Sequence, residues 1–505
     1  MKTLLYLGLT LAACRLSAQP IPAAPPAAQP LIRHLPPDAC AIYHFNLSVL
    51  QTKMPLSQLT ERIPLPQPNT YNRVLAAVLR DMSRAGIDTT RDLYITETNG
   101  MGRDSLHTTS LLVSLLDSSR WVAFLREQAP ERMGSACDSS MAVLTFVRSA
   151  ARSVAPAGVT ARAMRRSQRL LKGFADSTAI RDSLFLAGFA DDADIHAWTD
   201  QGKLLFLLTE KLFHLNHGLS YPALTPPGCG KVHTLSSLRF EKGRLVLKNT
   251  LCLPPGIDSL YARLTARPPS AGLLAQIPGG SLLGVINVHF NPAGIAPFLD
   301  GLQARGRSEA LLFDRGVSLE TFERSFTGDF LFTAIQPVSD SIPVKPSLYL
   351  AATLRDQTAF WSWTSHLKWL NPTSDPSGAG RVSTRNPISK KLPAYILRDS
   401  TVVISSTARK AAEWFAPHPS NARPAFPSRA DSCPVSGWVD FKALGASLQK
   451  RPERNRGLLP VLSALDTLTF TAGYLNSASQ LENITEIRFT NTEENSLKTL
   501  FKILQ

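Results

Sequence analysis

The sequence predicts an α+β protein, in which repeated strand–helix units form mostly antiparallel sheets with helices on one face. Two observations predict this class. The first is a motif that occurs three times, in Leu35–Leu50, Ile277–Leu302 and Cys433–Leu448. In each copy an apolar strand leads to a Phe and is followed by a helix. The elements downstream of the first two copies also follow in the same order, and a shared order of several elements is stronger evidence of a repeat than one match.

The three copies align on Phe45, Phe290 and Phe441. Alternate residues of a strand face opposite sides, so each strand has one apolar face, which we expect to lie on the core. Its members are Ala41, Tyr43 and Phe45 in the first copy, Ile286, Val288 and Phe290 in the second, and Gly437, Val439 and Phe441 in the third.

The other face of each strand carries a polar residue at the same place: His44, His289 and Asp440. If the three copies packed around one centre, a His–His–carboxylate set would suit a metal ion or acid–base chemistry. We favour the simpler interpretation, in which the three side chains lie on the solvated side of three strand ends. Asn46 and Asn291 are expected to cap the helices that follow, and Asp440 is expected to do so in the third copy.

A chain of 505 residues is long enough for two or three domains. We expect a first repeat domain at 31–253, a second at 277–415 and a shorter third repeat at 433–505. Periodicity and turn residues place the remaining elements. Helices are expected in Thr70–Arg84, after Ser118 and in Asn491–Leu504, strands in Arg91–Thr98, Thr109–Leu116, Asp466–Tyr474 and Leu481–Thr490, and a hairpin in His233–Leu253. Ile195–Leu215 and Tyr395–Phe415 both read as strand, turn, strand and helix.

The first 18 residues have the pattern of an export signal, with Lys2 before a short apolar core. Two endings fit. Leu16-Ser17-Ala18 suits ordinary signal peptidase, whereas Leu11-Ala12-Ala13-Cys14 fits a lipobox and would make Cys14 a lipidated N-terminus. We favour simple cleavage, and both endings predict a periplasmic or outer-membrane location. The Ala/Pro-rich residues 19–30 are expected to form an extended tether.

Composition and motifs limit the classes of function. With 44% hydrophobic and 18% charged residues the chain is expected to be globular. A net charge of +15 does not by itself indicate nucleic acid, and no zinc finger or RNA-binding motif accompanies it. The sequence has no Gly-rich phosphate loop, HExxH or GxSxG motif, so we assign no catalytic residue, metal ligand or cofactor. The acidic residues before His196 are expected to form a turn.

A basic segment stands apart from the rest of the chain. Residues 148–172 contain seven basic residues and no acidic one, and Arg162, Arg165, Arg166 and Arg169 share a helical face. One interpretation is a helix that faces an anionic surface. The other, which we favour, is a solvated insertion. Burying four arginines without carboxylate partners would cost far too much, so the segment is expected to be exposed and poorly ordered.

Five cysteines remain if Cys14 is removed, so at least one is unpaired. Cys229 and Cys252 flank the expected hairpin and are the best candidates for a disulfide. Trp361, Trp363 and Trp369 have helical spacing, which favours packing over a ligand platform.

Three segments together carry a resemblance to a known family. They are LPPDACAIYHFNLSVLQTK at Leu35–Lys53, FTGDFLFTA at Phe326–Ala334 and NTEENSLKTLFKIL at Asn491–Leu504. With the signal peptide, they resemble a Bacteroidota envelope family catalogued as domain of unknown function 4836. The resemblance covers nearly the whole mature chain except the basic segment. It implies export or lipoprotein anchoring, and it supplies no catalytic residue.

These observations predict an exported, non-enzymatic envelope protein that presents binding surfaces to a partner. The partner would be another envelope protein or an anionic surface, with no role for nucleic acid, and the membrane would be an anchor if Cys14 is lipidated. The alternative is a hydrolase or metal-dependent enzyme with its site between the repeats.

Overall fold

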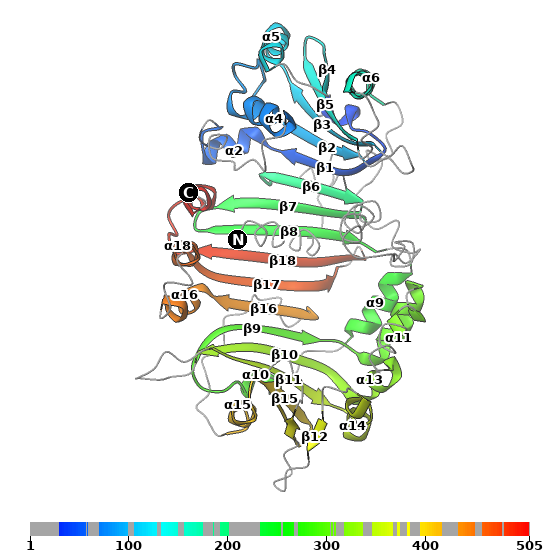
Figure 1. Cartoon of the computed structure of the whole chain (residues 1–505), viewed down its shortest axis with the longest axis vertical. Helices are drawn as coiled ribbons and strands as arrows, with labels where there is room; N and C mark the ends of the chain where they lie inside the picture. Colours follow the sequence, from blue (N-terminus) through cyan, green and yellow to red (C-terminus); the bar gives the residue numbers. More distant parts are fainter. Residues whose placement is uncertain are drawn as a thin grey trace. The chain divides into compact units, whose positions relative to one another are not determined.

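The structure is a computed structural model in which two compact units are described separately (Figure 1). The described residues are 30–56, 58, 70–98, 106–128, 133–149, 156–174, 185, 192–200, 233–253, 256–266, 271–303, 305–306, 308–309, 318–336, 346–366, 371–373, 381–383, 394–416, 433–449, 457–476 and 479–503. Unit 1 takes the described residues up to Cys252 and those from Glu493 onward, and unit 2 takes those from Leu253 to Thr492.

Unit 1 is built on an antiparallel sheet. Across this sheet the described strands lie in the order β4 (Met133–Cys137), β5 (Met141–Ser149), β3 (Leu106–Ser114), β2 (Leu93–Thr98), β1 (Ala39–Phe45), β6 (Ile195–Asp200), β7 (His233–Glu241) and β8 (Arg244–Cys252). Each strand runs antiparallel to its neighbours. The first copy of the strand–helix motif therefore lies in the middle of the sheet, between β2 and β6.

Alternation along these strands places apolar side chains on both faces of the sheet of unit 1. On one face the core includes side chains of β2, β3 and β5, and it is covered by α2 (Leu47–Lys53), α4 (Thr70–Arg80) and α5 (Ser118–Gln128). On the other face Ile42 and Tyr94 pack with Leu35 and with Leu170 of α6 (Pro156–Lys172). Leu35 lies directly after the short 3-10 helix η1 (Pro30–His34). The basic helix α6 therefore covers the face opposite to α4 and α5.

The last helix of the chain, α19 (Ser496–Ile503), completes the core of unit 1. Leu497 and Phe501, one helical turn apart, are buried in the same cluster as Phe240 of β7. The Nδ2 of Asn495 donates a hydrogen bond of 2.9 Å to the backbone oxygen of Phe240. Residues from the far end of the chain thus cover the β7–β8 hairpin.

Unit 2 is likewise built on antiparallel sheet. Its order is β14 (Ala394–Arg398), β15 (Thr401–Ser405), β11 (Ser347–Leu354), β10 (Phe326–Gln336), β9 (Ser281–His289), β16 (Val435–Asp440), β17 (Leu465–Leu475) and β18 (Gln480–Phe489). In sequence, β12 (Asn371–Thr373) and β13 (Arg381–Ser383) come directly before β14, and they form a separate two-stranded ladder. The described helical segments are α9 (Ile257–Thr265), α10 (Ala271–Ala275), η5 (Pro292–Gly294), α11 (Ile295–Gly301), α13 (Leu319–Ser325), α14 (Gln357–His366), α15 (Ala408–Glu413), α16 (Phe441–Gln449) and α18 (Leu459–Ala464).

The core of unit 2 also lies on both faces of its sheet. Val285, Leu331 and Trp414 belong to one cluster, with α10 and α15 nearby. Phe326 and Phe360 belong to a second cluster, which α13 and α14 cover. The predicted α+β class with mostly antiparallel sheets is confirmed by these two units, but in unit 1 helices cover both faces of the sheet rather than one.

The strands of the two units are arranged in the same order. Strands β1, β2, β3, β4, β5, β6, β7 and β8 of unit 1 take the same places as β9, β10, β11, β14, β15, β16, β17 and β18 of unit 2. The predicted third repeat at 433–505 is therefore not a domain, because β16, β17 and β18 extend the sheet of unit 2 from β9 while α19 belongs to unit 1. The strand of the third copy, β16, takes the place of β6 in its unit rather than that of β1. The predicted match of 195–215 with 395–415 is also wrong, because β6 corresponds in position to β16 and not to β14. Residues 201–215 lie outside the described part of the chain.

The caps of the motif helices follow the sequence in two of three cases. Asn46 Oδ1 accepts a hydrogen bond of 3.2 Å from the backbone N–H of Val49, and Asp440 Oδ1 accepts one of 2.8 Å from Ala443. Asn291 precedes η5 but makes no capping hydrogen bond, and its Nδ2 points instead to the backbone oxygen of Arg263 at 3.4 Å.

The two aligned phenylalanines are less buried than the pattern predicts. Phe45 and Phe290 are both half-buried rather than buried. Phe290 stacks on Phe330 of the neighbouring strand, with ring centroids 5.6 Å apart. Gly328, two residues before Phe330, has a φ of +100°, and a Cβ there would stand 1.8 Å from the backbone oxygen of Phe290. The glycine of the FTGDF segment is thus required by this close approach.

Tyr349 gives the stability of unit 2 a dependence on alkaline pH. Burial raises its pKa to about 12, and the nearby Glu413 carboxylate acts in the same direction. A tyrosine in the unfolded chain ionises near pH 10. Between pH 10 and 12 the folded state keeps a proton that the unfolded state loses, so the free energy of unfolding falls as the pH rises.

We expect this loss to be about 2–3 kcal/mol between pH 10 and 12. Denaturant unfolding of the wild type and of Tyr349→Phe at both pH values measures it. The variant should lack this part of the alkaline loss, and equal losses in the two proteins would contradict the assignment.

Candidate functional site

A buried cluster of ionisable rings spans three adjacent strands of unit 1. His44 of β1 lies directly across from His196 of β6, and their Nδ1 atoms are 3.0 Å apart. The two side chains are 2% and 0% exposed. On its other side His44 stacks on Tyr94 of β2, with centroids 4.8 Å apart. The Nε2 of His44 is 3.2 Å from Asp92, an ion-pair distance, although the atoms are not aligned for a hydrogen bond.

This geometry restricts the protonation of the cluster. A hydrogen bond between two Nδ1 atoms needs one ring to donate and the other to accept, so the pair shares one proton. Burial raises the pKa of Tyr94 well above its usual value, and the Asp92 carboxylate raises it further, so this phenol stays neutral. A substrate could not touch either imidazole without local opening of the sheet face. The cluster has the features of a fixed internal polar network rather than an open catalytic centre.

The predicted solvated position of the motif histidines is wrong. His44 and His289 are each 2% exposed, because both faces of each sheet are covered by other parts of the unit. Sequence alternation distinguishes two faces of a strand, but it does not reveal that both are covered.

The alternative interpretation, in which His289 meets Asp440, is excluded by strand direction. Strand β16 runs antiparallel to β9, and Val439 pairs with Gly284, so Asp440 is level with Leu283. His289 is six residues further along β9 (289 − 283), which is about 20 Å at roughly 3.3 Å per residue. Within the described part of the chain no group of three or more His, Cys, Asp or Glu side chains is placed to hold a metal ion.

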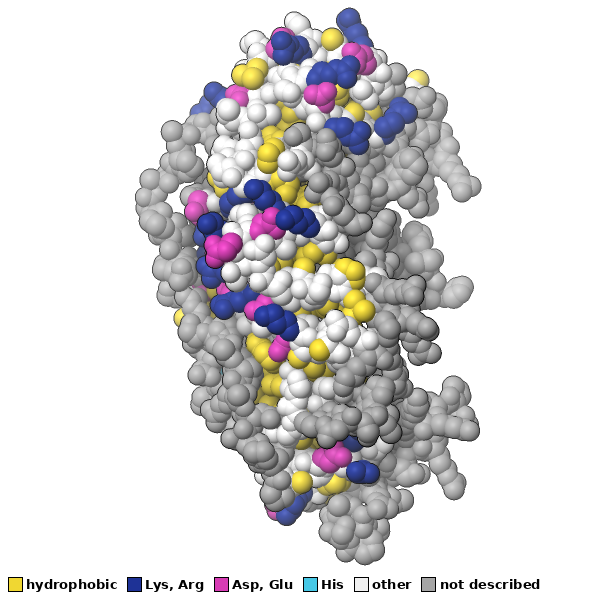
Figure 2. Space-filling model, turned by 90° about the vertical axis from the view of Figure 1, so that its left-hand side faces the viewer, with side chains coloured by type: hydrophobic (Ala, Val, Ile, Leu, Met, Phe, Trp, Pro, Cys, Tyr) yellow, Lys and Arg dark blue, Asp and Glu magenta, His cyan; other side chains and the backbone are white. Residues whose placement is uncertain are grey.

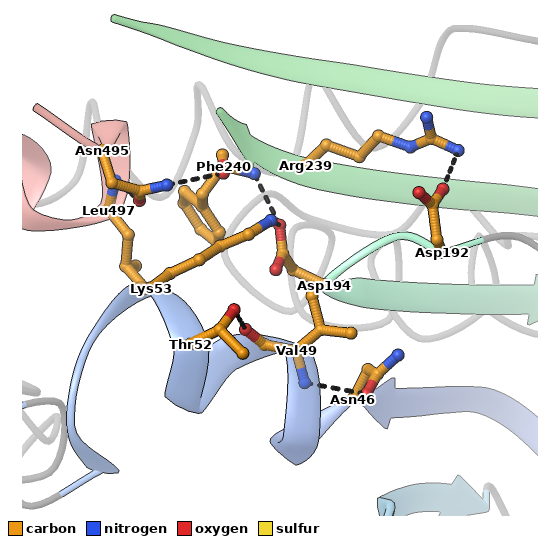
Figure 3. A network of polar contacts seen from close by, with 10 residues as sticks. All are labelled: Asn46, Val49, Thr52, Lys53, Asp192, Asp194, Arg239, Phe240, Asn495 and Leu497. Carbon is orange, nitrogen blue, oxygen red and sulfur yellow. Dashed lines mark hydrogen bonds and ion pairs between the residues drawn. The ribbon is translucent and has the colours of Figure 1, made fainter. Parts of the chain in front are cut away.

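A second polar network in unit 1 is centred on Asp194, just before β6 (Figure 3). Its carboxylate is 0% exposed, and Oδ2 accepts hydrogen bonds of 2.7 Å from Lys53 Nζ and 2.6 Å from the backbone N–H of Phe240. Lys53 is the last residue of α2, and its side chain is 21% exposed. Asp194 thereby ties α2 to β6 and β7.

The rest of this network surrounds the same carboxylate. The backbone N–H of Asn46 donates to the backbone oxygen of Asp194 at 3.0 Å, and Arg239 pairs with Asp192 at 2.8 Å. The other carboxylate oxygen, Oδ1, is buried and accepts no hydrogen bond from a described residue. Lys53 is therefore the cation on which the buried charge depends. Sequence analysis predicts only a turn at these acidic residues. It does not predict the ion pair, because Lys53 lies 141 residues away from Asp194.

The basic helix α6 is packed, contrary to the predicted poorly ordered insertion. Val159, Ala163, Ser167 and Leu170 form its buried face. Backbones approach closely there, since a Cβ on Gly134 of β4 would stand 2.1 Å from the backbone nitrogen of Met164. Ser167 Oγ also donates a hydrogen bond of 2.8 Å to the Gly134 backbone oxygen.

The four arginines of α6 differ in environment. Arg162, Arg165 and Arg169 are exposed as predicted. Arg166 is only 15% exposed and forms an ion pair of 2.6 Å with Asp38. This partner lies outside the basic segment, so a search of the neighbouring sequence could not find it.

The other sequence candidates have different outcomes. Cys14, Cys229 and Trp369 lie outside the described residues, as do the residues of the predicted signal and the side chain of Trp363. Trp361 packs edge to face on Phe360, as a core-packing role predicts. Burial, and then the Asp138 carboxylate, raise the pKa of the Cys137 thiol, which disfavours the reactive thiolate.

Comparisons with known proteins do not assign the chain to a class. No family model and no curated protein matches it. One solved structure that matches is described as crystal form IV of TP0453. It is 11% identical, with 49% of this chain and 89% of that chain covered and a TM-score of 0.25. A TM-score of this size carries no argument about fold or function.

Proposed function

We propose that this protein is an exported, non-enzymatic protein of the cell envelope that presents binding surfaces to a partner, and that the basic face of α6 is one of these surfaces. The observation that carries the proposal is a helix locked onto the sheet while Arg162, Arg165 and Arg169 remain in solvent. This packing fixes the position of the helix, and the three charged side chains take no part in the packing.

The envelope location is supported by the N-terminal pattern and by the resemblance to the Bacteroidota family of unknown function. Under this proposal the chain lies in the periplasm or at the outer membrane, with Cys14 as the anchor if the lipobox is used. In the described part of the chain no helix is both long and apolar enough to cross a bilayer.

We also infer that the chain consists of two copies of one ancestral unit. The identical order of strands in the two units supports this inference, as does the HFN sequence at the end of β1 and β9. The enzymatic alternative gains no support from the described residues, because the histidines it relied on are buried and His289 does not meet Asp440.

The proposal predicts a partner at α6 in intact cells. A photo-crosslinking residue at Gln168, which is exposed on α6, should give adducts in the envelope fraction. The same residue at Ser119, exposed on α5 of the same unit, serves as the matched control and should give none. Mass spectrometry of the mature N-terminus would show Gln19 or a lipidated Cys14. An uncleaved chain in the cytoplasm, or identical adducts at the two positions, would contradict the proposal.

A further inference from the structure

The exposed charges of α6 form one straight stripe. Arg162, Arg165, Arg169 and Lys172 are separated by three, four and three residues, and all four side chains are exposed. At about 100° per residue this spacing confines them to an arc of about 80°, and at about 1.5 Å per residue the stripe is about 15 Å long. Arg166 lies beside the stripe and is turned to Asp38.

These four charges are not neutralised within the described structure. None of them forms an ion pair with a described carboxylate, whereas Arg166 does. Elsewhere basic and acidic side chains are mixed: on the face in Figure 2, dark blue side chains lie beside magenta ones. Arg244 with Glu241 and Lys502 with Glu494 are such pairs in unit 1. As far as the described residues are concerned, the charge of the stripe is therefore available to a ligand.

The stripe is also held in position. The small side chains on the buried face of α6 let it lie directly on β4, with Gly134 against the helix backbone. The guanidinium of Arg169 stands 5.6 Å from the centre of the Phe174 ring, which limits its freedom. Binding would therefore order few additional groups.

We infer that this stripe binds the phosphate-rich surface of an anionic lipid bilayer. Arginine forks suit phosphate oxygens, and four cations in a line suit a flat array of headgroups better than one small anion. The apolar residues Val159, Ala163 and Leu170 of α6 are already packed against the sheet, so the helix would lie on the bilayer and would not insert. This inference rests on the proposed function, since headgroups would meet the stripe only after export.

Two other classes of partner fit the surroundings of the stripe less well. A protein partner needs an apolar anchor near the centre of its interface, and the exposed Met164 lies about 120° around the helix from the centre of the stripe. Single-stranded nucleic acid needs aromatic faces on which bases stack, and Arg169 covers the ring of Phe174.

The expected size of the effect follows from the number of charges. Each lysine or arginine near an anionic bilayer strengthens binding roughly fivefold, so loss of four should weaken it several hundredfold, on the order of 500-fold. The interaction should also fall steeply with salt, because the screening length is about 8–10 Å near physiological ionic strength. Surface charge of this kind commonly acts together with a second membrane anchor.

The test is co-sedimentation of the full chain, produced without lipid, with vesicles of phosphatidylcholine alone or mixed with phosphatidylglycerol. Binding to the uncharged vesicles measures any contribution of the apolar N-terminus. The stripe variant carries Arg162→Gln, Arg165→Gln, Arg169→Gln and Lys172→Gln. The matched control carries Arg73→Gln, Arg91→Gln, Arg120→Gln and Arg126→Gln, which removes four exposed charges from the same unit.

We expect the stripe variant to lose several hundredfold in affinity for the anionic vesicles and the control to lose far less. Equal binding by wild type and stripe variant, or equal losses in the two variants, would overturn the inference. Specific adducts at Gln168 without vesicle binding would also overturn it while leaving the proposed function intact. Circular dichroism confirms that each variant is folded.

Discussion

The Lys53→Met variant is expected to lose about 3 kcal/mol of the free energy of unfolding of unit 1. The substitution keeps the apolar stem of the side chain but removes the only cation among the described residues that pairs with Asp194. That carboxylate is 0% exposed and would keep only the hydrogen bond from Phe240. Leaving a buried charge without its partner is among the costliest single changes in a protein. Denaturant unfolding of wild type and variant measures the loss.

Two further proteins separate this cost from a general effect of charge. Lys502→Met removes an ion pair with Glu494 in the same unit, but Lys502 is 63% exposed, so the loss should stay near 0.5 kcal/mol. Adding Asp194→Asn to Lys53→Met removes the buried charge and should restore most of the stability. A loss of the same size in Lys502→Met, or no recovery in the double variant, would show that the charge of Asp194 is not the cause.

The second large effect concerns the C-terminal helix. Replacing both Leu497 and Phe501 with Ala should cost unit 1 about 5 kcal/mol or more, because each large side chain removed from a core costs about 2–5 kcal/mol. The free energy of unfolding of a folded protein is only about 5–15 kcal/mol, so unit 1 would become marginally stable. Amide hydrogen exchange should accelerate in β7 and β8, against which α19 packs, while the amides of β10 and β11 in unit 2 stay protected.

Lys498→Ala is the matched control for this helix. Lys498 is exposed on α19, so its removal should change exchange in β7 and β8 very little. If the double alanine variant leaves β7 and β8 protected, or exposes both units equally, the assignment of α19 to the core of unit 1 is wrong.

The parts of the fold that the sequence predicts are those with local causes. Strand alternation gives β1 and β9, and the capping residues Asn46 and Asp440 mark where α2 and α16 begin. The exposure of three arginines on α6 also follows from local composition. Each of these predictions depends on residues within about one helical turn.

The parts that the sequence does not predict depend on pairing across the chain. His44 meets His196 because β1 and β6 are neighbours in the sheet, although 152 residues separate them. The ion pairs of Asp194 with Lys53 and of Arg166 with Asp38 likewise join residues that are far apart in sequence. The third copy of the motif shows the limit most clearly. A central strand followed by a helix looks alike whether it is the first or the sixth strand of its unit, so β16 resembles β1 in sequence and occupies the place of β6.

The position of α19 has a consequence for the order in which the protein is made. Domains usually fold in the order in which they leave the ribosome. Here the described part of unit 2 comes from one continuous stretch of chain, whereas unit 1 also needs α19, which is synthesised after that stretch. Unit 1 can therefore complete its core only after the described residues of unit 2 have been synthesised, and in an exported chain this delay would leave the core of unit 1 incomplete until α19 has been made. A chain that stops before α19 would leave the core of unit 1 incomplete, so a folded unit 1 indicates that the described residues of unit 2 have already been synthesised.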